Sequence, residues 1–319
     1  MTAVQSRSPR FSRNGSRLPD LGFRIGTGAF AWLVVVLIVA LGVLLAVNGG
    51  EAFSKFGLGF LTGTDWNPIE GLYGALPFII GTLGSALIAI LIATPIGLLT
   101  AIFLAELAPR RVAIPLTFAI ELLAAIPSVV FGLWGVFILS PFLQSTIESW
   151  LVGLLGWIPI FAGPPFGIGM FAAGVILTLM ILPTIIAISR DVISAVPDNQ
   201  REAMLALGAT RWEMITKAVL PYARSGIFGA MILGLGRALG ETMAVTMVIG
   251  NRPEVPKSIF DSSQTIASQI ATTFNEAGLG LQTSALIALG LVLLVITMSL
   301  NVGARLLVWR VTKPGKGAA

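Results

Sequence analysis

The sequence contains no histidine and no cysteine. Their absence excludes disulfides, thiolate and imidazole metal sites, and any catalytic pair of a nucleophile and a histidine. The sequence also lacks a G-x-x-x-x-G-K-[ST] segment, the loop that cradles the phosphates of ATP in P-loop proteins. We therefore expect no catalytic residue, no metal ligand and no cofactor in this chain, and we predict that it is not an enzyme.

Charged residues are scarce, at 11% of the chain, whereas 55% of the residues are hydrophobic. A helix needs about 20 apolar residues to cross a hydrocarbon core roughly 30 Å thick. Runs of this length predict an all-α polytopic membrane protein with six transmembrane helices. The second run contains Pro95 and is longer than required, so we expect it to tilt or kink. The six runs lie at about 29–48, 75–104, 113–139, 167–189, 224–250 and 281–308.

The cations are unevenly distributed over these runs, in a chain whose net charge is +5 at pH 7. With six spans, 16 cations fall on one side of the membrane and 3 on the other, and Arg237 is left within a span. Lys and Arg are enriched in cytoplasmic loops, so both termini are expected to be cytoplasmic. The same enrichment accounts for the excess of cations, so no nucleic-acid partner is expected. The 16 are Arg7, Arg10, Arg13, Arg17, Arg24, Arg110, Arg111, Arg190, Arg201, Arg211, Lys217, Arg224, Arg305, Arg310, Lys313 and Lys316; the 3 are Lys55, Arg252 and Lys257.

The short apolar segment 147–161 is ambiguous because it contains Glu148 and Pro159. If it crossed the membrane, every later loop would change sides, so we expect an external helix in contact with lipid, with Trp150 and Trp157 near the headgroups. External segments could receive a soluble partner or act only as connectors. The expected organisation is a cytoplasmic basic tail (1–28), a first transmembrane helix (29–48), an external loop (49–74), a transmembrane core (75–308) with a cytoplasmic loop at 190–222, and a cytoplasmic tail (309–319).

The most informative loop reads DNQREAMLALGATRWEMITKAVLP, at 198–221. Asn199 with Glu202, and Thr210 with Glu213, have the spacing of capping boxes at helix starts. The pattern predicts two short helices, of which the second continues into the fifth span.

Gly208 suits the left-handed turn between these helices, and Ala203, Met204 and Leu207 give the first helix a narrow apolar face. Three interpretations are open: a connector folded back on the membrane, a DNA-binding helix-turn-helix, and a helix that docks in a groove of another protein. The tether between two spans disfavours DNA binding.

The loop resembles the EAA loop of ABC importer permeases. In that loop, Glu-Ala-Ala is followed by three residues, Gly, nine residues and an Ile-x-Leu-Pro-like ending. Here the pattern is Glu202-Ala203-Met204, three residues, Gly208, nine residues and Ala218-Val219-Leu220-Pro221. Met204 and Ala218 depart from the pattern, but each is an apolar residue in place of another apolar residue. In that family the short helix docks on an ATPase subunit, which implies this role for Glu202, Ala203, Leu207 and Gly208.

Three further segments resemble the phosphate-specific permeases of ABC transporters, of the PstC type: 74–111, 121–135 and GLGRALGETMAV at 234–245. The likeness covers most of residues 70–305. It implies the type I importer architecture and ATP-driven import of inorganic phosphate across the bacterial cytoplasmic membrane. It also implies three partners: a second homologous permease, a cytoplasmic ATPase dimer that binds ATP and Mg, and an external phosphate-binding protein.

Arg237 and Glu241 lie within the fifth apolar run, where a charge costs about 2.5–3.5 kcal/mol on insertion scales. Their i, i+4 spacing would place them on one helix face, within reach of each other. One interpretation is an ion pair that locks helix packing. The other is a site on the path of an oxyanion, since the planar fork of Arg suits such anions. We expect Arg237 to exchange Glu241 for phosphate when the pathway opens.

Two residues of the third run are further candidates for the substrate pathway. Glu121 either faces a cavity or pairs with an arginine of the cytoplasmic side. Ser128, next to Pro127, could donate to an anion, although bonding back to its own helix is the commoner role of a helical serine. A proline here can also kink the helix.

Other functions are compatible with parts of this pattern. An ion-coupled secondary carrier could use an Arg–Glu pair, although we find no internal repeat of the kind such carriers often show. A membrane scaffold without transport would tolerate loss of Arg237. Within ABC permeases, the substrate could instead be sulfate, molybdate or tungstate.

Overall fold

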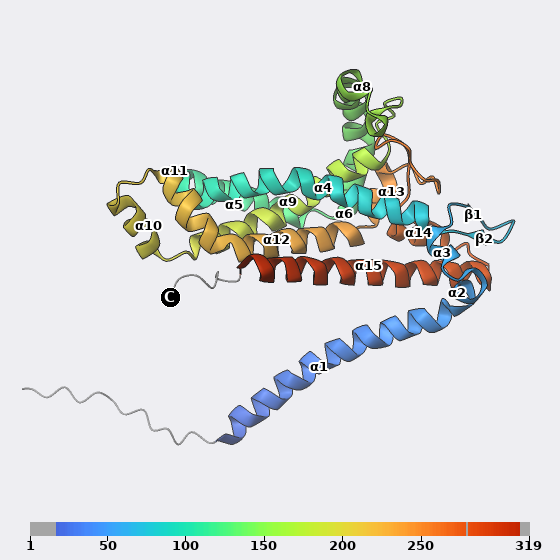
Figure 1. Cartoon of the computed structure of the whole chain (residues 1–319), viewed down its shortest axis with the longest axis horizontal. Coiled ribbons are helices and arrows are strands. Elements are labelled where there is room, and N and C mark those ends of the chain that lie inside the picture. Colours follow the sequence, from blue (N-terminus) through green and yellow to red (C-terminus); the bar gives the residue numbers. More distant parts are fainter. Residues whose placement is uncertain (1–16, 279, 313–319) are drawn as a thin grey trace, which may run out of the picture. The chain divides into compact units, whose positions relative to one another are not determined.

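The computed structural model describes residues 17–278 and 280–312. The chain separates into two units, one ending at Val47 and the other beginning at Asn48, and each is described by itself. The first consists of helix α1 (Arg17–Asn48), which starts well before the expected residue 29 and contains an apolar stretch long enough to cross a membrane (Figure 1). The predicted tail cations Arg7, Arg10, Arg13, Lys313 and Lys316 lie outside the described residues.

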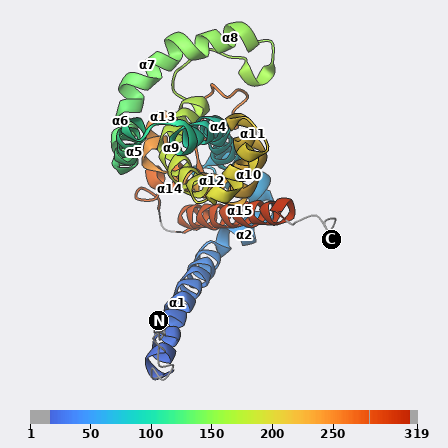
Figure 2. The ribbon, with the colours of Figure 1, turned by 90° about the vertical axis from the view of Figure 1, so that its left-hand side faces the viewer.

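In the second unit, four long helices lie side by side (Figures 1 and 2). Helix α9 is central, because 67% of its most apolar window is buried, against 33% for α4. Small residues permit the close packing of α4 on α9: a Cβ added to Gly174 would lie 2.4 Å from Cγ2 of Ile88. Helix α4 continues through Pro95. The four helices are α4 (Leu76–Ile102), α9 (Met170–Ser194), α12 (Leu220–Gly240) and α15 (Leu281–Thr312).

The third apolar run does not form one helix. Helix α5 (Arg110–Ala125) ends before Ile126, whose ψ of 127° is the extended conformation favoured before a proline. A second helical run then begins at Ser128 and continues to Leu155. The predicted span at 113–139 and the separate helix at 147–161 are therefore wrong in their bounds. The run comprises α6 (Ser128–Trp134), the π-helical η2 (Gly135–Leu139), α7 (Ser140–Phe142), the π-helical η3 (Leu143–Glu148) and α8 (Ser149–Leu155).

The end of this run, here called the arm (α7 to α8), turns away from the four long helices and crosses their direction (Figures 1 and 2). The returning chain, with the 3₁₀ turn η4 (Pro159–Phe161), is tied to the arm by Glu148. This side chain is 1% exposed, and its Oε2 accepts a hydrogen bond from the N–H of Gly167 at 2.8 Å. Glu148 therefore fixes the return of the chain, which explains a carboxylate within an apolar segment.

The fifth apolar run is also interrupted. Helix α11 (Arg211–Met214) continues through η5 (Ile215–Val219) into α12, which ends at Gly240. Glu241 is extended, with ψ of 131°, and helix α13 (Met243–Val248) follows. The predicted span 224–250 is therefore two helices. The break lies directly after Gly240, and Arg237 lies in the last turn before it.

The two ends of the second unit differ. The hairpin end carries α2 (Gly50–Phe56), α3 (Gly59–Thr62), strands β1 (Trp66–Asn67) and β2 (Leu72–Tyr73), which pair antiparallel, and α14 (Ile266–Thr273). Phe60, Phe78 and Ile266 are buried in its core, so the predicted loop at 49–74 is a folded layer. The opposite end carries α10 (Asp198–Ala206) and α11, and is called the α10 end.

Candidate functional site

The two helix breaks lie next to each other. A Cβ added to Gly132 of α6 would lie 3.2 Å from Cα of Ala244 and 2.5 Å from Sδ of Met247, both in α13. One turn later, a Cβ added to Gly135 would lie 2.8 Å from Cγ1 of Val248. The contacts advance in the same direction along both helices, so α6 and α13 pack side by side and run parallel.

This arrangement brings two of the predicted pathway residues to the starts of these helices. Ser128 is the first residue of α6, so no earlier turn of its own helix can accept a back-bond from it. Glu241 precedes α13, and its Oε1 accepts from the N–H of Ala244 at 3.4 Å. A carboxylate is stabilised at a helix N-terminus because the first N–H groups lack helical acceptors.

Arg237 lies in the last turn of α12 and is exposed. Its Nη1 lies 3.5 Å from Oγ1 of Thr184 on α9. Among the ion pairs of residues 17–278 and 280–312, none joins Arg237 to Glu241. The i, i+4 geometry expected for an unbroken helix is absent because α12 ends between the two residues. The expected exchange of Glu241 for phosphate therefore lacks its starting pair in this conformation.

The glycines of α12 fall on two faces. Gly226 and Gly234 face α9, where an added Cβ would lie 2.4 Å from Val192 and 3.1 Å from Ile185. An added Cβ on Gly229, Gly236 or Gly240 would meet no atom within 4 Å. The face of α12 that carries Gly229, Gly236 and Gly240 is therefore uncovered in the described part of the chain.

Glu121 lies on α5, is exposed, and lines an open pocket of about 410 Å³ together with Thr117 and Arg190, a geometry compatible with both predicted alternatives. Arg190 donates to Asp191, with Nη2 to Oδ1 at 2.7 Å. No described residue of α5 is buried, and Ile114 and Phe118 are more than half exposed. The apolar side chains of α5 are therefore not covered by any other described part of the chain.

The predicted coupling residues share the outer surface of the α10 end. Glu202, Ala203, Leu207 and Gly208 are all exposed, Leu207 to 84%. Gly208 has φ of +81°, as the left-handed turn requires. Met204 instead points inward and packs on the cluster around Ile193, Ile215 and Val219, so Ala203, Met204 and Leu207 do not form one apolar face.

One predicted capping box is confirmed and one is wrong. The N–H of Glu213 donates to Oγ1 of Thr210 at 3.2 Å, and Oε2 of Glu213 accepts from the N–H of Thr210 at 3.0 Å. Helix α10 begins at Asp198 after Pro197, so Asn199 lies inside the helix and caps nothing.

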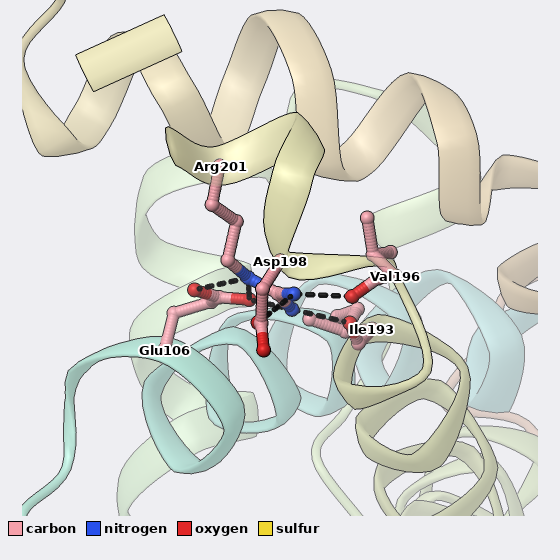
Figure 3. A network of polar contacts seen from close by, with 5 residues as sticks. All are labelled: Glu106, Ile193, Val196, Asp198 and Arg201. Atoms are coloured by element: carbon pink, nitrogen blue, oxygen red, sulfur yellow. Dashed lines mark hydrogen bonds and ion pairs between the residues drawn. The ribbon is translucent and has the colours of Figure 1, made fainter. Parts of the chain in front are cut away.

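Arg201 is a residue that the sequence did not single out. It extends from α10 to Glu106 of the π-helical turn η1 (Phe103–Leu107), which follows α4 (Figure 3). Its Nη2 lies 2.8 Å from Oε1 of Glu106, and Nε lies 3.2 Å from the same oxygen. The hydrogen bonds that Arg201 donates to the Glu106 carboxylate raise the pKa of Arg201 further above its ordinary value. The two residues are 95 positions apart, and no local pattern reveals the pair.

Residues 93–313 match the family described as binding-protein-dependent transport system inner membrane component. The chain belongs to this family. It is 47% identical to the phosphate transport system permease protein PstC of Pasteurella multocida over 306 residues, with 95% of each chain covered. It is 45% identical to the protein of the same name from Mesorhizobium japonicum, with 98% of each chain covered.

A solved relative has the same fold. The match is to a chain of a bacterial alginate ABC transporter in complex with a periplasmic protein bound to alginate pentasaccharide, with a TM-score of 0.61 and 16% identity. It covers 93% of this chain and 98% of that one. The described part of the chain has six helices long and apolar enough to span a membrane. Together with the family, they show a multi-pass inner membrane protein with the architecture of an ABC importer permease.

Proposed function

We propose that this chain is the permease subunit of an ATP-driven importer of inorganic phosphate. The observation that carries the proposal is the exposed guanidinium of Arg237, which lies within the transmembrane core beside two helix breaks. A cation at this depth is costly unless it faces a polar pathway. The relatives named as phosphate transport permeases support phosphate as the anion.

A second, homologous permease subunit would complete the pathway. The uncovered glycine face of α12 and the exposed apolar side chains of α5 are the surfaces that it would cover. Arg237, Glu241, Ser128 and Glu121 would then line the space between the two subunits. With Glu241 held at the start of α13, the guanidinium of Arg237 would be available to an oxyanion, which it can bind with two parallel hydrogen bonds.

The other partners would act at the two ends. A cytoplasmic ATPase dimer, which would bind ATP and Mg, would dock on Glu202, Ala203, Leu207 and Gly208 of the α10 end. A phosphate-loaded binding protein would dock at the opposite, hairpin end. In this proposal the α10 end and both termini would be cytoplasmic, as the cation distribution favours. Closure of the ATPase dimer would then tilt the spans between inward-open and outward-open states.

The test is phosphate uptake by the assembled transporter in proteoliposomes, with the Arg237→Gln variant and the exposed Arg211→Gln variant as a matched control. We expect Arg237→Gln to abolish most uptake and Arg211→Gln to retain it. Wild-type uptake by Arg237→Gln would refute the proposed site. Uptake that needs no ATP and collapses with an uncoupler would indicate an ion-coupled carrier. Competition by sulfate, molybdate or tungstate would indicate another oxyanion.

A further inference from the structure

The guanidinium of Arg201 joins three segments at the α10 end (Figure 3). It binds Glu106 in η1, which continues α4. Its Nη2 also donates to the carbonyl oxygen of Ile193, in the last turn of α9, at 2.9 Å. Its Nη1 donates to the carbonyl oxygen of Val196, just after α9, and to Oδ1 of Asp198 at 3.1 Å. All five N–H groups of the guanidinium can therefore be used at once.

This arrangement differs from the other ion pairs of the α10 end in its burial. The side chains of Arg201 and Glu106 are 16% and 7% exposed. Those of Lys217 and Glu213 are 63% and 40% exposed, although their distance of 2.9 Å is nearly the same. Exposed pairs contribute little because solvent screens them, whereas loss of one buried partner leaves an uncompensated charge. The Arg201–Glu106 pair is thus a fixed connection between α10 and the long helices.

Helix α10 has two faces with separate contacts. Arg201 and Met204 point inward, to the ends of α4 and α9 and to the cluster around Ile193. Glu202 and Ala203, the residues between them, are exposed. A displacement imposed on the outer face would therefore reach the long helices through the inner face. On that face, Arg201 makes hydrogen bonds, which are directional, whereas Met204 makes apolar contacts.

We propose that Arg201 is a positioning residue that transmits movement of α10 to α4 and α9 through Glu106 and the carbonyl groups at the end of α9. This inference rests on the proposed function, because the movement would come from the partner ATPase. Without the connection, α10 would still dock, but it would shift without moving the spans. ATP would then be hydrolysed with little phosphate transported.

The first experiment measures phosphate transported per ATP hydrolysed by the complete transporter in proteoliposomes. The variants are Arg201→Lys, which keeps the charge but loses the planar fork, and Glu106→Gln, which keeps the shape but loses the charge. We expect both to lower the ratio by about tenfold, while the ATPase subunit still co-purifies. Two control variants should keep the wild-type ratio: Arg211→Gln, at an exposed arginine of the same loop, and Asp198→Asn, at a carboxylate that is itself 88% exposed. An unchanged ratio in Arg201→Lys and Glu106→Gln would overturn the proposal.

The second experiment needs no ATPase, and so separates this inference from the proposed function. Because the chain contains no cysteine, a spin label at Gln200→Cys reports on α10 alone in the purified full chain. We expect Glu106→Gln to increase the mobility of the label and Arg211→Gln to leave it unchanged. Unchanged mobility in Glu106→Gln would refute the connection even if the ATPase docks. Increased mobility without any ATPase docking would refute only the proposed partner.

If Glu106→Gln does not yield folded protein, the exchanged pair Glu106→Arg with Arg201→Glu provides the same test. The exchange restores one cation and one anion but removes the planar fork from α10 and its bonds to the carbonyl oxygens of Ile193 and Val196. We expect it to fold and to transport phosphate at a ratio still several-fold below wild type. A wild-type ratio would show that the pair only stabilises the fold.

Discussion

Arg237 and Arg201 occupy opposite environments in one chain. Arg237 is exposed on α12, and its one side-chain hydrogen bond among the described residues joins it to Thr184 at 3.5 Å. Arg201 is nearly buried and donates to a carboxylate, a second carboxylate and two carbonyl groups. Arginine is thus used in two ways: Arg237 is exposed and available to a ligand, whereas Arg201 makes a fixed contact within the fold.

The difference lies in what surrounds each guanidinium. Acceptors at the ends of α4 and α9 bind the guanidinium of Arg201, so its hydrogen-bonding groups are occupied within the fold. Around Arg237, the break after Gly240 directs Glu241 to α13 instead, so no carboxylate of the described residues pairs with the guanidinium. Stability should therefore depend on Arg201 and not on Arg237, whereas loss of Arg237 should impair transport without loss of stability.

The largest expected effect is on stability. Arg201→Met leaves the Glu106 carboxylate buried without its cation, and loss of one partner of a buried pair costs about 3–5 kcal/mol. Arg237→Met should change the free energy of unfolding by less than about 0.5 kcal/mol. Unfolding of the purified full chain in detergent measures both. Equal losses in the two variants would contradict the comparison.

The next effect is on transport. Hydrogen bonds to charged groups contribute about 1.5–3 kcal/mol, so Arg237→Gln should lower the rate of phosphate uptake roughly 10- to 100-fold. Arg237→Lys keeps the charge but not the planar fork, so its rate of phosphate uptake should lie between those of Arg237→Gln and wild type. Uptake rates in proteoliposomes that contain equal amounts of assembled transporter distinguish the variants. Identical rates for Lys and Arg would mean that charge alone suffices.

The two faces of α12 provide a third test. Gly234→Val would place its Cβ 3.1 Å from Ile185, and overpacking of this kind costs about 1–3 kcal/mol. Gly236→Val meets no atom within 4 Å, so the isolated chain should lose well under 1 kcal/mol. Thermal unfolding of both proteins should separate them. A greater loss for Gly236→Val would mean that the face of α12 that carries Gly229, Gly236 and Gly240 is covered within this chain.

The smallest effect concerns the capping box at the α10 end. Thr210→Ala removes the acceptor for the N–H of Glu213 and should cost about 1 kcal/mol. Because this contact is exposed and distant from the Arg201 contacts, the ratio of phosphate to ATP should not change. Unfolding and transport measured on the same preparation test this separation. A fall in the ratio would indicate that coupling depends on the whole loop.

Local signals in the sequence predicted much of this structure. Run length and hydrophobicity indicate membrane helices because the bilayer sets their dimensions. The Thr210–Glu213 spacing and Gly208 identified a helix start and a left-handed turn correctly, since both depend on neighbouring backbone groups.

Hydrophobicity did not reveal the helix breaks, because apolar residues continue through both. Pro127 indicated a kink, but the continuation of α6 to Leu155 depends on packing and on the bond between Glu148 and Gly167. At the second break, the i, i+4 spacing of Arg237 and Glu241 suggested a shared face that exists only in an unbroken helix. The Arg201–Glu106 contact joins distant segments and becomes visible only when α4, α9 and α10 are packed.

The contact at Gly132 has a mechanical consequence. With no room for a side chain between α6 and α13, neither half-helix can slide past the other without a clash of backbone and Met247. We therefore expect the two to move together about their breaks, with the arm that ends in α8 as the continuation of α6. A rotation of α6 and α13 that widens the space beside Arg237 should therefore move the arm as well.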